Sequence, residues 1–151
     1  MFLVRFIRVD AKPTEEYPYR TQEEAEKHFS LFLNDDSGLY KNISIYDDVR
    51  NQTAKILRFK GNKPAGVFCN HDCVRLNREF AEPEELHNLY AIINLNEETD
   101  RAEISCLTSG LTIPPVETVG LWMIRTVGTT LEDILNAGGF PESVSNILEM
   151  N

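Results

Sequence analysis

The spacing of apolar residues predicts three strands and a loop in the first 60 positions. Residues 2–9 are rich in Phe, Val and Ile and indicate a strand that is buried on both faces. Residues 10–19 contain two prolines and indicate a loop. Residues 42–46 alternate between apolar and polar side chains and indicate a strand. The apolar residues of 54–59 indicate the return strand, which follows a longer polar turn.

A helix is predicted between the first two of these strands. Thr21 and Glu24 have the spacing of a capping box, in which each side chain satisfies a free backbone N–H at the start of a helix. Most apolar residues from Ala25 to Leu33 then fall on one helical face. Short polar residues and a glycine at 34–38 end the helix. This part of the chain is therefore predicted to form a β-α-β-β unit.

The second part of the chain begins with a break at residues 61–66, which are rich in Gly, Asn and Pro. Residues 67–76 are predicted to form a short strand. Residues 83–94 are predicted to form a helix, because a proline suits its first turn and four apolar residues follow at i, i+3, i+4 and i+7. A strand over residues 90–95 is the competing interpretation.

Two further strands and two short helices complete the pattern. Residues 101–106 alternate and predict a strand, and residues 119–127 predict a strand with apolar residues on both faces. Thr129 and Glu132 have the spacing of a second capping box, which predicts a helix that ends at a pair of glycines. Pro141 is predicted to start the final helix.

These elements predict an α+β fold in which antiparallel sheets carry helices packed on one face. A β-α-β-β unit covers residues 1–60. A mixed lobe of strands and helices covers residues 61–151, ends in two short helices and is expected to share one core with the first unit. The length of 151 residues and the 42% of hydrophobic residues are sufficient for a core of this size.

The composition also indicates where the protein acts. The apolar run at the N-terminus is interrupted by Arg5 and Arg8, so we do not expect it to be a signal peptide. No stretch approaches the roughly 20 apolar residues that a membrane helix needs. Cys69, Cys73 and Cys106 are too few, and odd in number, for a disulfide framework. We therefore expect a cytoplasmic protein with reduced thiols and no membrane partner.

The net charge of −9 is unevenly distributed along the chain. The part that ends at Lys60 contains ten basic and ten acidic residues, whereas the part from Gly61 onward contains five basic and fourteen acidic residues. Such an acidic surface repels nucleic-acid phosphates, so direct binding to DNA or RNA is not expected. The same surface is suited to a basic protein, including one that itself binds nucleic acid, although acidity can also serve solubility alone.

One cluster suggests a metal site. If Cys69, His71 and Cys73 lie on one strand, they project from the same face, because the side-chain period is two. Two thiolates and an imidazole are good zinc ligands, and Cys106 would be a fourth. The alternating spacing differs from the usual zinc turns and leaves neighbouring ligands roughly 6.5–7 Å apart. Ordinary packing is the simpler interpretation of these three residues.

No motif indicates catalysis. The three histidines lack the signature of a cysteine nucleophile, and Gly66 is not followed by the Lys-Ser/Thr of a phosphate-binding loop. Residues 35–38 resemble half of a calcium loop, but Tyr46 stands where the bidentate glutamate is needed. The aromatic residues Phe80, Tyr90, Trp122 and Phe140 fit a core better than an exposed binding patch. We therefore predict a protein that is not an enzyme and needs no cofactor.

Two segments resemble known proteins. Residues 20–40 are similar to a segment of small uncharacterised proteins of gut Gram-positive bacteria and their mobile elements. Residues 84–90, Glu-Glu-Leu-His-Asn-Leu-Tyr, resemble a helix of antirestriction proteins of the ArdA type. Those proteins are acidic and imitate DNA, so the resemblance implies an inhibitor of DNA-binding defence enzymes. The neutral charge of residues 1–60 departs from that pattern.

The leading hypothesis is a non-enzymatic acidic binding protein that engages a basic protein surface. One form would be a mobile-element or phage inhibitor of a host nucleic-acid-binding defence protein. The carboxylates assigned to this surface flank the predicted helix over residues 83–94, and they are Glu82, Glu84, Glu85, Glu97, Glu98 and Asp100. The alternatives are a small-molecule or zinc-binding protein that uses Cys69, His71 and Cys73, and a structural subunit of a mobile-element or virion assembly. The sequence identifies neither the partner nor the oligomeric state.

Overall fold

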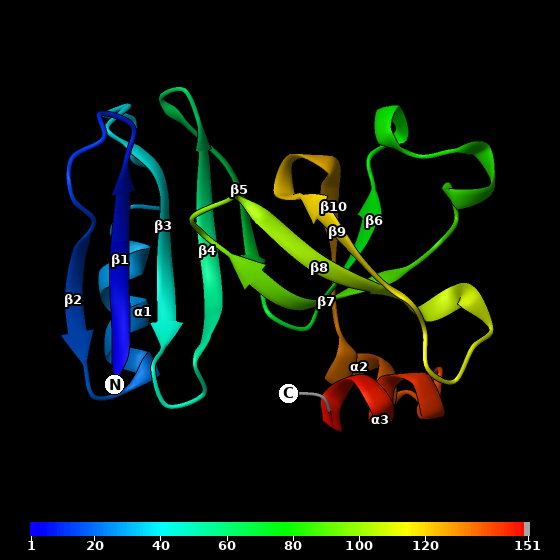
Figure 1. The fold of residues 1–151 in the computed structure, drawn as a ribbon. Helices are drawn as coiled ribbons and strands as arrows, with labels where there is room; N and C mark the ends of the chain where they lie inside the picture. Colours follow the sequence, from blue (N-terminus) through cyan, green and yellow to red (C-terminus); the bar gives the residue numbers. More distant parts are fainter. Residues whose placement is uncertain (150–151) are drawn as a thin grey trace. The chain divides into compact units, whose positions relative to one another are not determined.

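The computed structural model describes residues 1–149, which divide into two compact units. Unit 1 comprises Met1–Cys69 together with Leu95–Asp100, and unit 2 comprises Asn70–Asn94 and the chain from Arg101 onward. The described residues form two antiparallel five-stranded sheets and three α-helices (Figure 1). The predicted α+β class, with two short helices at the C-terminal end, is confirmed.

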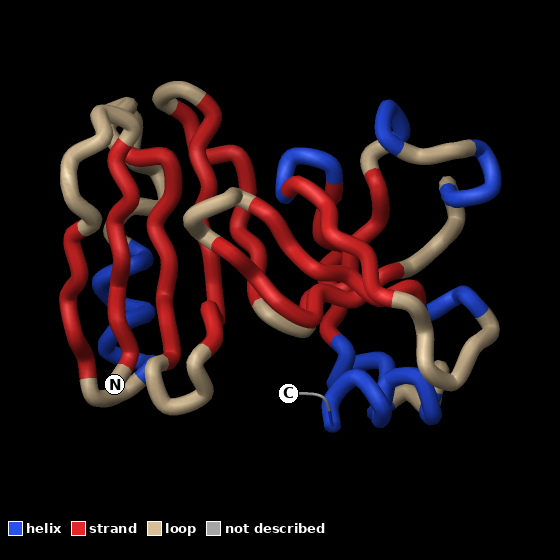
Figure 2. The backbone as a smooth tube through the Cα atoms, in the orientation of Figure 1, coloured by secondary structure: helices blue, strands red, loops and turns tan. Residues whose placement is uncertain are grey.

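The sheet of unit 1 has the strand order β2-β1-β3-β4-β5, and all of its neighbouring strands are antiparallel. Figure 2 shows its strands in red and the helix that packs on it in blue. Helix α1 (Gln22–Ser30) begins as predicted, because the Thr21 hydroxyl accepts the Glu24 backbone N–H at 3.2 Å. It packs against β1, β2 and β3. The strands are β1 (Phe2–Arg8), β2 (Glu15–Tyr19), β3 (Tyr40–Asp47), β4 (Gln52–Lys60) and β5 (Lys63–Cys69).

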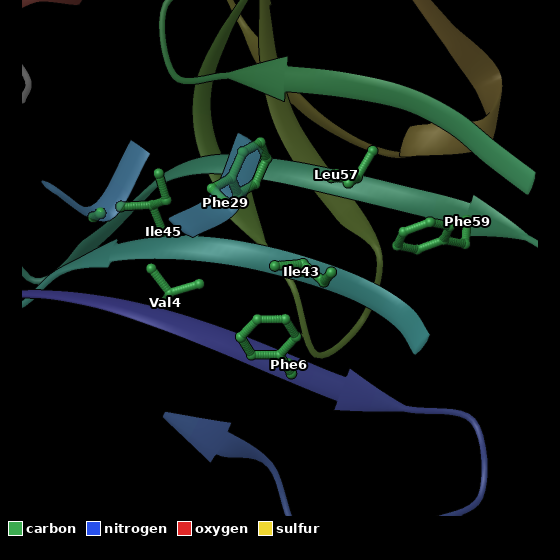
Figure 3. Packing of buried hydrophobic residues seen from close by; sticks show 8 residues of the cluster. Val4, Phe6, Phe29, Ile43, Ile45, Leu57 and Phe59 are labelled. Carbon is green, nitrogen blue, oxygen red and sulfur yellow. The ribbon is translucent and has the colours of Figure 1, made fainter. Parts of the chain in front are cut away.

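The core of unit 1 lies between this sheet and α1 (Figure 3). Alternate residues of β1, β3 and β4 share one face of the sheet, because side chains alternate along a strand. Phe29 of α1 packs into the same cluster and is completely buried. The buried residues of the cluster are Val4, Phe6, Ala25, Phe29, Ile43, Ile45, Leu57 and Phe59.

The loop predicted over residues 10–19 is wrong for its second half, because Glu15–Tyr19 form strand β2. It pairs with β1 and places Pro18 opposite Leu3. Strand β2 lies at the edge of the sheet. A proline is tolerated on an edge strand, since the missing N–H can face away from the ladder. The prolines therefore exclude a strand in the centre of the sheet, but they do not exclude a strand at its edge.

The sheet that lies mainly in unit 2 has the strand order β10-β6-β7-β8-β9. Helices α2 (Leu131–Asn136) and α3 (Pro141–Glu149) supply Leu131, Val144 and Ile147 to a core that also contains Cys73. The strands are β6 (Asp72–Leu76), β7 (Tyr90–Asn96), β8 (Arg101–Cys106), β9 (Val116–Gly120) and β10 (Ile124–Thr130). Short 3-10 turns occupy Arg78–Phe80, Pro83–Glu85, Leu107–Ser109 and Leu121–Met123.

The helix predicted over residues 83–94 is wrong, and the competing strand is confirmed. Only Pro83–Glu85 forms a short 3-10 turn, and β7 begins at Tyr90. Four successive residues at the start of β7 are all buried. A strand covered on both faces has a continuous apolar run, which also satisfies helical spacing over a short window.

The strand predicted over residues 67–76 is two strands that belong to different sheets. Strand β5 ends at Cys69, and β6 begins at Asp72. His71 between them has a φ of 71°, a left-handed conformation that interrupts a strand. The unit boundary therefore follows Cys69 and not Lys60, because β5 completes the sheet of unit 1. A core shared by both parts of the chain stays a prediction.

The strand predicted over residues 119–127 is also divided. Strand β9 ends at Gly120 and β10 begins at Ile124, yet the two occupy opposite edges of their sheet. In a flat sheet of five strands these edges would lie roughly 19 Å apart. The four Cα–Cα steps from Gly120 to Ile124 reach at most about 14 Å. The sheet must therefore curl until its two edges approach each other at this corner.

Candidate functional site

The six carboxylates assigned to a partner surface are divided between the two units. Residues 97–100 form the turn after β7 and belong to unit 1, whereas residues 82–85 lie in unit 2. The sequence placed both groups at the ends of one helix, which does not form. The two groups therefore need separate descriptions.

Glu97 is buried in unit 1, with 6% of its surface exposed. Arg5 Nη1 donates to Glu97 Oε1 at 2.9 Å, and the Thr53 hydroxyl donates to Oε2. The backbone carbonyl of Glu97 accepts the Asn42 side-chain amide at 2.7 Å. Each of these contacts fixes the turn to the sheet of unit 1.

Asp100 is held in the same way, since the Arg58 guanidinium lies 3.2 Å from its Oδ2. Both Asp100 and Glu97 are buried and paired with arginines of unit 1. They are not accessible to a partner protein and do not belong to the proposed surface. Glu98 between them is exposed, and its backbone carbonyl accepts Lys41 Nζ at 3.2 Å. It belongs to unit 1, so it is not included in the acidic surface of unit 2. The arginine partners are 42 and 92 residues away in sequence, so local reasoning missed these pairs.

Glu82, Glu84 and Glu85 lie on the short turn that precedes β7 in unit 2. Glu82 and Glu85 form a capping box, in which the Glu82 backbone N–H donates to Glu85 Oε1 at 2.9 Å. Glu82 and Glu84 are exposed, and Glu85 is half-buried. Glu79, on the preceding turn, is also exposed. This segment therefore presents three exposed carboxylates, Glu79, Glu82 and Glu84, which we call the 79–84 acidic segment.

The two units differ in how far basic residues balance their acidic residues. Unit 1 contains eleven basic and thirteen acidic residues, and unit 2 contains four basic and eleven acidic residues. In unit 2, His71 Nδ1 lies 3.1 Å from Glu132 Oε1, and this contact is ionic only when the imidazole is protonated. Unit 1 has ion pairs at Arg5–Glu16, Arg5–Glu97, Arg8–Asp10, Arg50–Asp47, Lys55–Glu26 and Arg58–Asp100.

Glu117 is a further carboxylate of unit 2 outside the 79–84 acidic segment. Glu117 lies on the edge strand β9, and desolvation of its carboxyl raises its pKa. The negative charge of Glu85 raises the pKa of Glu117 further. The side chain is nevertheless largely exposed. Like charges that lie close together without a cation favour binding of a basic group.

The structure does not assemble Cys69, His71 and Cys73 into a metal site. Within residues 1–149, no group of three or more His, Cys, Asp or Glu side chains is arranged to hold a metal ion. Cys73 lies in the hydrophobic core of unit 2, where burial raises the pKa of its thiol to about 11. A zinc ligand must be a thiolate, so this environment opposes coordination. The predicted strand that aligned the three side chains is interrupted at His71.

An apolar cavity in unit 2 was missed by sequence reasoning. Its volume is about 560 Å³, and it lies between the turn after β8 and the start of α3. Leu111 and Phe140 both line the cavity, and both are exposed, at 55% and 43%. The lining residues are Leu107, Thr108, Gly110, Leu111, Thr112, Phe140, Pro141, Glu142 and Ser143.

The expectation that four aromatic residues lie in the core is correct only for Tyr90. Phe80, Trp122 and Phe140 are each about two-fifths exposed. Leu111 and Ile113 are apolar residues in a loop between Gly110 and Pro114, where no periodicity assigns them to a core. That pattern was the available signal for an exposed apolar site.

No family model matches the chain, and no curated protein or solved structure matches it significantly. The resemblances of residues 20–40 and 84–90 therefore stay predictions. Among the described residues, no helix is long and apolar enough to cross a membrane.

Proposed function

We propose that this chain is a non-enzymatic binding protein of the cytoplasm that uses the acidic surface of unit 2 to engage a basic protein. The observation that supports it most is that basic residues balance the acidic residues of unit 1 much better than those of unit 2. Several acids of unit 1 are paired with arginine or lysine, whereas unit 2 has eleven acidic residues and only four basic ones. Removing such acids from water against a basic surface would relieve their mutual repulsion.

The partner class follows from the sign and the density of charge. A surface with seven more acidic than basic residues repels nucleic acid and attracts proteins whose own surfaces are basic. Proteins that bind nucleic acid carry such basic surfaces. An inhibitor encoded by a mobile element or phage, which occupies the nucleic-acid site of a host defence protein, is the form that we propose.

Electrostatic attraction mainly increases the association rate, so a stable complex also needs apolar contacts. The apolar cavity beside α3 would supply them. Phe140 and Leu111 stand exposed at this cavity, and Glu142 also lines it. A partner residue with an apolar stem and a cationic end, such as arginine or lysine, would fit this combination.

The test is capture of partners from a lysate of the source cells with tagged full-length protein, followed by quantitative mass spectrometry. The test variant combines Glu79→Gln, Glu82→Gln and Glu84→Gln, which removes the charge of the 79–84 acidic segment and keeps acceptors for its local hydrogen bonds. The control variant combines Glu23→Gln, Asp36→Asn and Glu98→Gln. These are exposed acids of unit 1, so the control has the same net charge as the test variant.

We expect the wild type and the control variant to retain one basic protein at about 50 mM salt and to lose most of it at 1 M, because salt screens exposed charges. The test variant should retain several-fold less at low salt. Equal retention by both variants, or a partner retained unchanged at 1 M salt, would contradict the proposal. A large stable homo-oligomer in native mass spectrometry would favour a structural subunit of an assembly instead.

A further inference from the structure

Three of the four basic residues of unit 2 lie around one cavity. The cavity has a volume of about 330 Å³ and lies where β6 and β10 meet the segment before β7. No carboxylate lines it, although unit 2 contains eleven acidic residues. The lining residues are Arg75, Leu76, Arg78, Leu86, His87 and Arg125.

The register of the sheet brings two of these arginines face to face. Arg75 of β6 and Arg125 of β10 are directly opposite each other in the antiparallel pair. Side chains at such positions project from the same face and lie close together, and like charges there destabilise the sheet. No described salt bridge involves either arginine. A bound anion would therefore relieve the repulsion between the two guanidinium groups.

Backbone contacts hold both guanidinium groups in place. Arg75 Nη1 donates to the carbonyl oxygens of His87 at 2.9 Å and Asn88 at 3.2 Å. Arg125 Nη1 donates to the carbonyl oxygen of Leu76 at 2.8 Å. A guanidinium has five N–H donors on three nitrogens, and these bonds use only one nitrogen of each group. The other donors are available to a ligand at little cost in side-chain entropy.

We propose that this cavity binds a phosphate group carried by a small molecule. Arginines recognise the oxygen atoms of phosphate through paired N–H donors, and three of them suit a dianion better than a single carboxylate. Leu76 and Leu86 form apolar walls that would contact the organic part of the ligand. The volume is at the lower end of the range for ligand pockets, which favours a small phosphorylated compound.

The acidic surroundings add selectivity to this site. An extended polyanion such as DNA would bring many phosphates close to the carboxylates of unit 2, whereas a small molecule brings only one or two. The site requires no protein partner. This proposal and the proposed function can therefore fail independently.

The experiment is an NMR titration of the full-length protein with inorganic phosphate and, in parallel, with phenyl phosphate and benzoate. Ionic strength is held constant with sodium chloride, and ligand concentrations stay below about 10 mM, so that general salt effects remain small. The variants are Arg78→Gln and Arg125→Gln. Arg101→Gln is the matched control, since Arg101 is the fourth basic residue of unit 2 and lies over the Trp122 ring and not at the cavity.

We expect saturable shifts of amide signals from β6, β10 and residues 86–88 with phosphate and phenyl phosphate, and weaker binding of benzoate. Each test variant should raise the dissociation constant for phenyl phosphate at least tenfold, and Arg101→Gln should leave it within about twofold. Shifts that do not saturate, an equal loss of binding in Arg101→Gln, or tighter binding of benzoate than of phenyl phosphate would overturn the proposal. Arg78 is exposed, so we expect Arg78→Gln to fold normally. This variant therefore tests the site even if Arg125→Gln disturbs the fold.

Discussion

The buried ion pair of Glu97 with Arg5 gives the sharpest prediction about stability. Replacing Glu97 by glutamine preserves the shape of the side chain and an oxygen that can still accept the Thr53 hydroxyl. It removes the negative charge that faces Arg5 Nη1 at 2.9 Å. The guanidinium is then left beside a neutral amide in an environment where its side chain is only 22% exposed.

The magnitude follows from the contacts that remain. Breaking a fully buried ion pair from one side costs about 3–5 kcal/mol. Arg5 keeps a second ion pair with the partly exposed Glu16 at 2.9 Å, which reduces that cost. A hydrogen bond to a charged group contributes about 1.5–3 kcal/mol. We therefore expect Glu97→Gln to lower the free energy of unfolding of unit 1 by about 2 kcal/mol.

Native-state hydrogen exchange is the suitable assay, because it resolves the units separately. The single tryptophan, Trp122, lies in unit 2, so its fluorescence does not report on unit 1. A loss of about 2 kcal/mol corresponds to roughly thirtyfold faster exchange of the most protected amides of β1 and β3. The neighbouring Glu98→Gln, at an exposed position, should change stability by less than about 0.5 kcal/mol. Equal effects of the two substitutions would refute the assignment of Glu97 to a buried ion pair.

Three further predictions concern single groups. Hydrogen bonds from Arg8 lower the pKa of Asp10 from 3.8 to about 2, so its stabilising contribution is complete above pH 4 and is lost as the pH falls through 2; a carboxyl titration midpoint near 4 in NMR would disprove this. Cys73 should react with iodoacetamide at pH 8 at least tenfold more slowly than the two half-buried thiols, because burial raises its pKa to about 11; similar rates in peptide mapping would count against a buried thiol. Gly120→Ala should change the Trp122 emission maximum, since a Cβ would lie 2.4 Å from ring atoms; an unchanged spectrum would show that the ring does not cover Gly120.

Elements that are specified by neighbouring residues were predictable from the sequence. Helix α1 has its cap and its apolar residues close together in sequence, and the structure confirms the Thr21 cap and the buried Ala25 and Phe29. The helix ends at Ser30, before the predicted stop at residues 34–38. The apolar patterns of residues 42–46 and 54–59 likewise identified β3 and β4, two strands of the core of unit 1. Strand β7 was misread as a helix because both of its faces are covered, and that cover comes from distant segments.

The candidate site was less predictable because it depends on pairing between distant residues. The acidity of the second half was visible in the sequence, but Glu97 and Asp100 are compensated by arginines of the first half. No local pattern distinguishes them from the exposed Glu98. The opposition of Arg75 and Arg125 exists only through the register of β6 and β10, which no composition argument can supply.

The affinity of unit 2 for a captured basic partner is the most direct test of the central claim. It should be measured by calorimetry at several salt concentrations for the wild type and for the two triple variants described above. We predict that the variant of the 79–84 acidic segment binds at least about tenfold more weakly at 50 mM salt and has a shallower salt dependence. The unit 1 variant should match the wild type. Equal affinities and equal salt dependences for all three proteins would contradict an acidic docking surface on unit 2.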